Sequence, residues 1–120
     1  MPSKNKNLDP SVATIVALAG DRAHNAAEAK WREMYEEHGD MHACGFAWVN
    51  IYGVRSNSKI GKALATLGFK KSDWNKCLQL WNPGKYMGQS VDIKEEAARA
   101  YANELTAITG IECFVGSRLD

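Results

Sequence analysis

The sequence contains little that would mark a catalytic centre or a membrane segment. It has three cysteines and three prolines among 120 residues, and no apolar run approaches the roughly 20 residues of a membrane-spanning helix. The Gly-x-Ser-x-Gly elbow, the phosphate-binding loop and the dinucleotide fingerprint are all missing. A formal net charge of +1 excludes a tail that acts through bulk charge of one sign. We therefore expect one domain without enzyme activity, a bound cofactor or a contact with membranes.

The cysteines are odd in number, lie far apart and sit inside apolar runs, which argues against a disulfide framework. We expect Cys44, Cys77 and Cys113 to be small buried residues in a reducing compartment. Residues 1–9 are polar, do not resemble a secretory signal and are predicted to form a mobile tail. The cytoplasm is the expected location.

The spacing of apolar residues predicts a helical N-terminal segment over residues 10–38, ended by Gly39. An unbroken helix would be ~43 Å long at about 1.5 Å per residue, so we expect it to break at Gly20 or to project toward a partner.

Residues 43–120 are predicted to form a core of strand, helix, strand, helix and strand. The fold class is α+β, or a small α/β fold, with a three-stranded sheet packed by helices. The predicted strands are 43–52, 76–81 and 111–115, the helices are 58–67 and about 90–109 with a cap at Asp92, and residues 70–73 are predicted to be a turn.

Charge is concentrated in one part of the chain. Residues 55–76 hold six basic residues and one acidic residue, whereas residues 41–54 hold neither kind. Tyr52 and Trp81 lie on either side of this basic segment. Because cations neutralise phosphates and aromatic rings stack on bases, the pattern favours nucleic-acid binding. A solvated helix face, an acidic protein surface or an anionic small ligand would also account for it. The predicted contacts are Arg55, Lys59, Lys62, Lys70, Lys71, Trp74 and Lys76.

Polar residues also gather where predicted strands end and predicted helices begin. If the strands are parallel neighbours, these residues share one rim of the sheet, where α/β folds bind ligands. Exposed amides at helix starts attract anions there. Simple capping and turn chemistry would explain the same residues. The candidates for an anion or nucleotide pocket are Arg55, Ser56, Asn57, Gln89, Ser90 and Arg118.

A tight cluster of residue types that bind metals spans residues 38–44. It consists of His38, Asp40, His42 and Cys44. Gly39 ends a helix within it and a strand follows, so the four side chains cannot share one face. Alternation would gather His42 and Cys44 at most, and we predict no metal site.

The first helix is acidic and offers a second kind of interface. Its apolar residues Trp31, Met34 and Tyr35 are candidates for a partner surface or a homodimer seam.

Five segments resemble a family of small proteins of unassigned function from tailed bacteriophages and bacterial genomes. They are Cys44-Gly45-Phe46-Ala47-Trp48-Val49, Arg55-Ser56-Asn57-Ser58-Lys59, Leu80-Trp81-Asn82-Pro83, Gln89-Ser90 and Gly116-Ser117-Arg118-Leu119-Asp120. The resemblance covers about the last 80 residues and implies an accessory role in a host cell, with no site residue to transfer.

The leading hypothesis is a non-catalytic accessory protein that binds nucleic acid through residues 55–76, with Trp74 or Tyr52 stacking on bases. The alternative is a modulator that binds a host or defence protein through the first helix. The third is a pocket that sequesters a nucleotide-like ligand.

Overall fold

The structure is a computed structural model that describes residues 10–39, 43–72 and 77–119. Those residues contain three helices and four strands, which confirms the α+β class. In chain order the elements are α1 (Pro10–His38), β1 (Gly45–Ile51), α2 (Lys59–Thr66), β2 (Lys70–Ser72), β3 (Cys77–Trp81), α3 (Val91–Thr109) and β4 (Phe114–Leu119).

The four strands form one antiparallel sheet in the order β2-β3-β1-β4. The expectation of three strands is therefore wrong, and so is the parallel arrangement on which the rim pocket depended. The extra strand is β2, at residues predicted to be a turn. Lys70, Lys71 and Ser72 pair with β3 through the backbone, which needs no apolar side chain, and lysines are common on edge strands.

β4 lies further along the chain than the predicted strand 111–115. It includes Gly116 and Ser117, which were expected to be a tail, and pairs along most of β1 from Asn50↔Phe114 to Gly45↔Leu119. Glycine and serine are poor strand formers in isolation, and this pairing outweighs their preference. β1 is consequently the central strand between β3 and β4.

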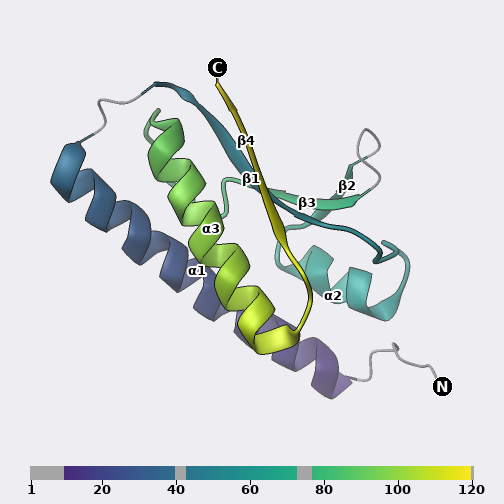
Figure 1. Cartoon of the computed structure of the whole chain (residues 1–120). Coiled ribbons are helices and arrows are strands. Elements are labelled where there is room, and N and C mark those ends of the chain that lie inside the picture. Colours follow the sequence, from purple (N-terminus) through teal and green to yellow (C-terminus); the bar gives the residue numbers. More distant parts are fainter. Residues whose placement is uncertain (1–9, 40–42, 73–76, 120) are drawn as a thin grey trace.

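From β1 onward, the order strand, helix, two strands, helix and strand is that of the split β-α-β arrangement. In Figure 1, α3 lies across β1 and β4, and both contacts bury apolar side chains. All three helices contribute to one core with the inward residues of the sheet, such as Val49, Ile51 and Leu78. This side of the sheet is called the helix face below.

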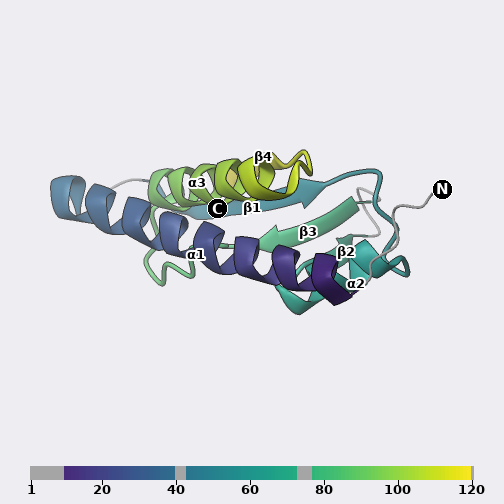
Figure 2. The same ribbon diagram turned by 90° about the horizontal axis from the view of Figure 1, so that it is seen from below.

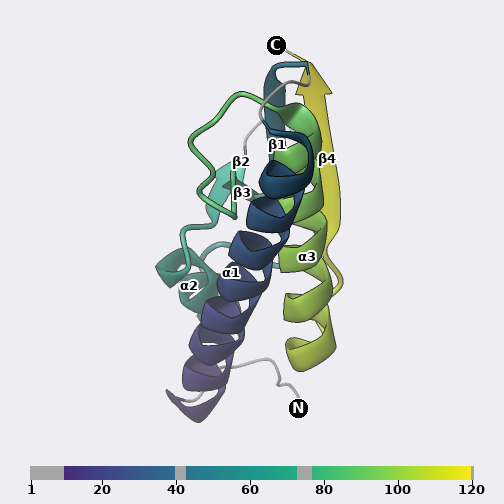
Figure 3. The same ribbon diagram turned by 90° about the vertical axis from the view of Figure 1, so that its left-hand side faces the viewer.

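α1 runs without a break through Gly20 and packs along α3 (Figures 1 and 3). Gly20 is buried because α2 approaches closely: a Cβ atom there would lie 2.4 Å from a methyl carbon of Leu67. Figure 2 shows α1 running along the molecule with α2 near one end, and the long axis of the molecule is 50 Å. The break predicted at Gly20 is wrong, since an elongated core accommodates the whole helix.

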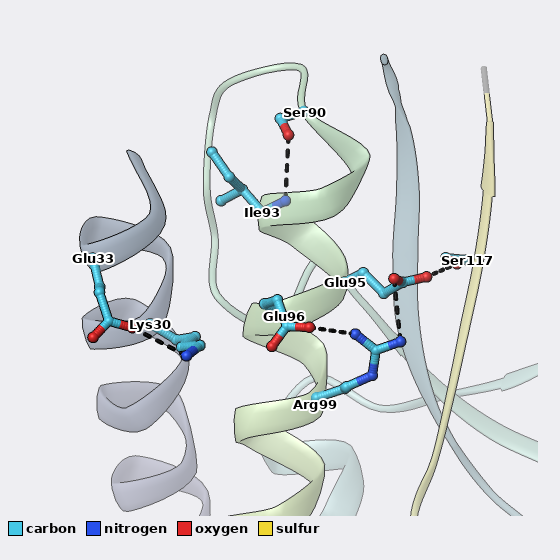
Figure 4. Close-up of polar contacts among 8 residues, drawn as sticks. All are labelled: Lys30, Glu33, Ser90, Ile93, Glu95, Glu96, Arg99 and Ser117. Atoms are coloured by element: carbon cyan, nitrogen blue, oxygen red, sulfur yellow. Dashed lines mark hydrogen bonds and ion pairs between the residues drawn. The ribbon is translucent and has the colours of Figure 1, made fainter. Parts of the chain in front are cut away.

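Serine residues cap both later helices. Ser58 accepts a hydrogen bond from the Gly61 amide at 3.0 Å, and Ser90 accepts one from the Ile93 amide at 3.3 Å (Figure 4). The cap predicted at Asp92 is wrong, because that residue already lies in the first turn of α3. Within the described residues, no helix is long and apolar enough to cross a bilayer.

Candidate nucleic-acid interface

Alternation along β1 separates two kinds of side chain. Ala47, Val49 and Ile51 are buried on the helix face, whereas Phe46 and Trp48 point the other way. Register puts their cross-strand neighbours on the same side: Trp81 opposite Trp48, Gln79 opposite Asn50 and Arg118 opposite Phe46. Among the described elements no helix covers this second side, which we call the open face.

Three aromatic rings, Phe46, Trp48 and Trp81, meet on the open face and are called the aromatic platform. Trp48 and Trp81 stack with centroids 4.8 Å apart and planes 28° apart, and Phe46 tilts against Trp81 at 5.7 Å. Trp48 lies over β4 because Gly116 has no side chain: a Cβ atom there would come within 2.3 Å of the indole nitrogen. Trp81 remains 46% exposed. The platform therefore presents aromatic surface to solvent.

Two cations lie beside Phe46. The guanidinium carbon of Arg118 is 5.8 Å from the ring centroid and the ammonium nitrogen of Lys94 is 5.2 Å from it. Lys94 belongs to α3 and is buried, but its ammonium reaches the Gly45 carbonyl and donates a hydrogen bond at 2.9 Å. Both distances fit cation–π contact. Positive charge is thus held at the edge of the platform.

A chain of side-chain hydrogen bonds on the open face fixes the position of Trp81. The Trp81 indole nitrogen donates to Gln79 Oε1 at 2.5 Å, and Gln79 Nε2 donates to Asn50 Oδ1 at 2.9 Å. The thiol of Cys77 donates a second hydrogen bond to the same Oδ1 of the buried Asn50. Burial raises the pKa of Cys77, so the thiol stays protonated and can act as a donor. These contacts restrict the rotation of Trp81 before any ligand arrives.

The open face continues toward the far end of β1. Tyr52 and Phe114 meet there edge to face at 5.7 Å, and each leaves nearly half of its surface exposed. Near the platform, a hollow of about 420 Å³ lies between Lys70 and Trp81, with Gln79 in its wall. At the Tyr52 end, a larger cavity adjoins the loop after β1 and contains Arg55 and Lys71 in its lining.

The predicted basic segment is divided by the fold. Arg55 and Lys71 come together at the larger cavity, and Lys70 lies beside the platform. Lys59 and Lys62 are exposed on α2, which packs against α1. Trp74 and Lys76 lie outside the described residues. Stacking by Trp74 therefore remains a prediction, whereas Tyr52 is on the open face.

The six residues expected to share one rim pocket lie at opposite ends of β1. Arg55, Ser56 and Asn57 follow the carboxyl end of β1. At the amino end, Gln89 accepts a hydrogen bond from the Gly45 amide, Ser90 bridges to Cys44, and Arg118 pairs with Phe46. Antiparallel pairing causes the separation, since neighbouring strands then end at opposite edges.

The residues proposed for a partner on the first helix are partly used inside the chain. Trp31 packs against Tyr86 with ring centroids 5.2 Å apart, and Tyr35 contacts the same ring at 6.3 Å. Met34 is half-buried, while Tyr35 leaves 47% of its surface exposed. A partner that buried Trp31 would have to displace the loop containing Tyr86.

Of the three cysteines that were expected to be buried, only Cys77 is fully buried. Cys113 is partly buried and burial raises its pKa, whereas Cys44 is exposed because it precedes β1 at the end of the sheet. The described residues contain no cluster of three or more side chains suited to a metal ion.

Of the four metal-binding residue types between positions 38 and 44, Asp40, His42 and the side chain of His38 lie outside the described part of the structure.

The aromatic platform was not among the predicted sites. The sequence nevertheless contained a signal for it. Aromatic and polar residues alternate along the strand with the aliphatic residues Ala47, Val49 and Ile51. Such alternation is typical of a strand with one solvated face.

No protein-family model, no curated protein and no solved structure matches the chain.

Proposed function

We propose that the open face binds single-stranded nucleic acid. The observation that carries this proposal is the aromatic platform, two stacked indoles and a phenyl ring on the central strands β1 and β3. Four-stranded sheets that stack two or three bases on aromatic side chains are a known mode of single-stranded RNA recognition. The likeness to that mode is one of architecture, so the argument depends on the side chains of the face itself.

Stacking would supply much of the affinity. A base stacked on an aromatic side chain contributes about 1–3 kcal/mol, and does so for every base type. Trp81 is the main candidate because it is exposed and its indole nitrogen is already bonded to Gln79. A ring held in place loses less entropy on binding, which favours the complex.

Phosphates would be met by cations around the platform. Arg118 lies on one side, at β4, and Lys70 on the other, at β2, so a strand crossing the platform passes near both. With two or three phosphate contacts, the logarithm of the affinity should fall with the logarithm of the salt concentration with a slope of about −1.4 to −2. Such a small slope agrees with a net charge of only +1.

As part of the same proposal, the protein has an accessory role in a bacteriophage and acts in the cytoplasm of the host cell. This part depends on the resemblance of the five sequence segments. Binding of a host or defence protein through α1 is the weaker alternative, because Trp31 already packs against Tyr86.

Fluorescence anisotropy with labelled eight-nucleotide strands of uridine and of thymidine, at 50 mM salt, tests the proposal. Trp81→Leu keeps apolar surface but removes the stacking ring, and should weaken binding by about 5-fold to 100-fold. Tyr35→Leu is the matched control, since Tyr35 is exposed to the same degree but lies on α1. Unchanged affinity of Trp81→Leu, or no binding of either strand, would contradict the proposal.

A further inference from the structure

A cavity of about 700 Å³ lies just beyond the carboxyl end of β1. The loop after β1 forms one wall, and residues of β2 and β3 form the rest. Its size is within the range of small-molecule sites, which is about 300–1,000 Å³. The described lining residues include two cations and no carboxylate: Gly53, Val54, Arg55, Ser56, Asn57, Lys71, Cys77 and Leu78.

The two cations come from different elements, Arg55 from the loop and Lys71 from the edge strand β2. Among the described residues neither forms an ion pair. Two like charges beside one cavity repel each other unless an anion lies between them. The hydroxyl of Ser56 and the amide of Asn57 add uncharged groups that can donate hydrogen bonds.

The loop that carries Arg55 is held rigidly. The Arg55 carbonyl accepts hydrogen bonds from the Ser58 amide at 3.1 Å and from the Ser58 hydroxyl at 2.6 Å. Gly61 lets the loop pack onto the first turn of α2, because a Cβ atom at that position would come within 2.1 Å of the same carbonyl oxygen. The backbone at Arg55 is therefore in place before a ligand binds, which lowers the entropic cost of binding.

The cavity lies close to the open face. Cys77 lines the cavity and also donates a hydrogen bond to Asn50, which belongs to the hydrogen-bonded chain beside the platform. Gly53 lines it too and directly follows Tyr52, whose ring is exposed on the open face. A strand that crosses the platform from Arg118 to Lys70 would reach β2, where Lys71 lines both the hollow beside Trp81 and this cavity.

We infer that this cavity binds the terminal phosphomonoester of a single-stranded nucleic acid, with Arg55 and Lys71 as the phosphate ligands. The inference rests on the proposed function of the open face. A terminal phosphate carries more charge than an internal one and projects from the end of the strand, so it can enter a cavity that the continuous backbone cannot. The protein would then prefer strand ends over internal sequence.

The test compares eight-nucleotide strands with a 5′-phosphate, with a 3′-phosphate or with hydroxyl groups at both ends. One phosphorylated form should bind about tenfold more tightly than the unphosphorylated strand. Arg55→Gln and Lys71→Gln should each remove this advantage and leave the unphosphorylated strand bound as before. Lys62→Gln is the matched control, an exposed lysine of α2 that does not line the cavity. Circular dichroism and thermal melting verify that each variant is folded.

The outcomes separate the two proposals. Equal affinity for the three strands, with binding still lost in Trp81→Leu, overturns the inference and leaves the open face as the binding site. A phosphate advantage that survives both Arg55→Gln and Lys71→Gln overturns it as well. A different outcome is that a nucleoside monophosphate binds as tightly as the phosphorylated strand without displacing any strand. That result would identify a free nucleotide as the ligand and would overturn the strand-end assignment. Absence of binding by every strand overturns both proposals.

Discussion

The two faces of the sheet are built by the same strands but from different kinds of side chain. On the helix face, Val49 and Ile51 are fully buried among aliphatic neighbours. On the open face, the rings of Trp48 and Trp81 stack above a strand glycine and remain partly exposed. Aliphatic burial is favourable in many arrangements, whereas the platform is held in one arrangement by specific contacts. The helix face therefore accounts for folding, and the open face has features that folding does not require.

The largest expected effect is the difference in stability between a substitution on the helix face and one on the open face. Ile51→Ala removes a fully buried side chain and should lower the free energy of unfolding by about 2–5 kcal/mol. Trp81→Leu should lower it by less than about 1.5 kcal/mol, since much of that ring is already in solvent. Urea denaturation of both variants measures the difference. Equal losses would mean that the open face is a second hydrophobic core.

A smaller effect is expected from filling the space beneath Trp48. Gly116→Ala should cost about 1–3 kcal/mol, because the new methyl group would overlap the indole ring and a rigid ring cannot bend away. In the Trp48→Ala background the same substitution should be nearly neutral. A double-mutant cycle in urea gives this coupling directly. Additive losses would show that Gly116 matters to β4 alone and not to the platform.

The smallest expected effect is the change in unfolding free energy when Tyr101, on the helix side of the sheet, ionises. Burial raises the pKa of Tyr101 to about 12, and its ring packs near Phe69 with centroids 6.3 Å apart. Because an exposed tyrosine has a pKa of about 10, the stabilisation is complete below pH 10 and is lost as the pH rises toward 12.

Tyr101→Phe keeps the ring and removes the ionising group. Relative to this variant, the parent protein should lose about 1 kcal/mol of unfolding free energy between pH 9 and pH 11. Urea denaturation at pH 9, 10 and 11 measures it, and the lysines cancel because both proteins share them. Parallel curves for the two proteins would show that Tyr101 can ionise while the protein is folded.

Elements that depend on local signals were predicted well. The first helix and the strand at 76–81 agree with the structure to within a residue or two. The strand β2 was missed because Lys70 and Lys71 carry no strand signal, and β4 was displaced because its glycine and serine suggest a tail. β4 forms through pairing with β1, which is distant in sequence, whereas β2 forms through pairing with β3, the next strand in the chain.

Two of the predicted contact residues lie together in the structure, and their role in binding stays a prediction. Arg55 and Lys71 were named as contacts and do meet at one cavity, although 16 positions separate them in the chain. The aromatic platform was not named, because nothing local indicates that Trp48 lies over Gly116 or stacks on Trp81.

Hydrophobic spacing, caps and glycine stops were sufficient for the α+β class and the positions of the helices, because helices form through contacts three or four residues apart. Strand order and strand direction depend on the backbone pairing of β1 with β3 and β4, which lie far from it in the sequence, and no short pattern encodes that pairing. That pairing put the aromatic residues of two strands on one exposed face and sent the expected rim residues to opposite ends of the sheet.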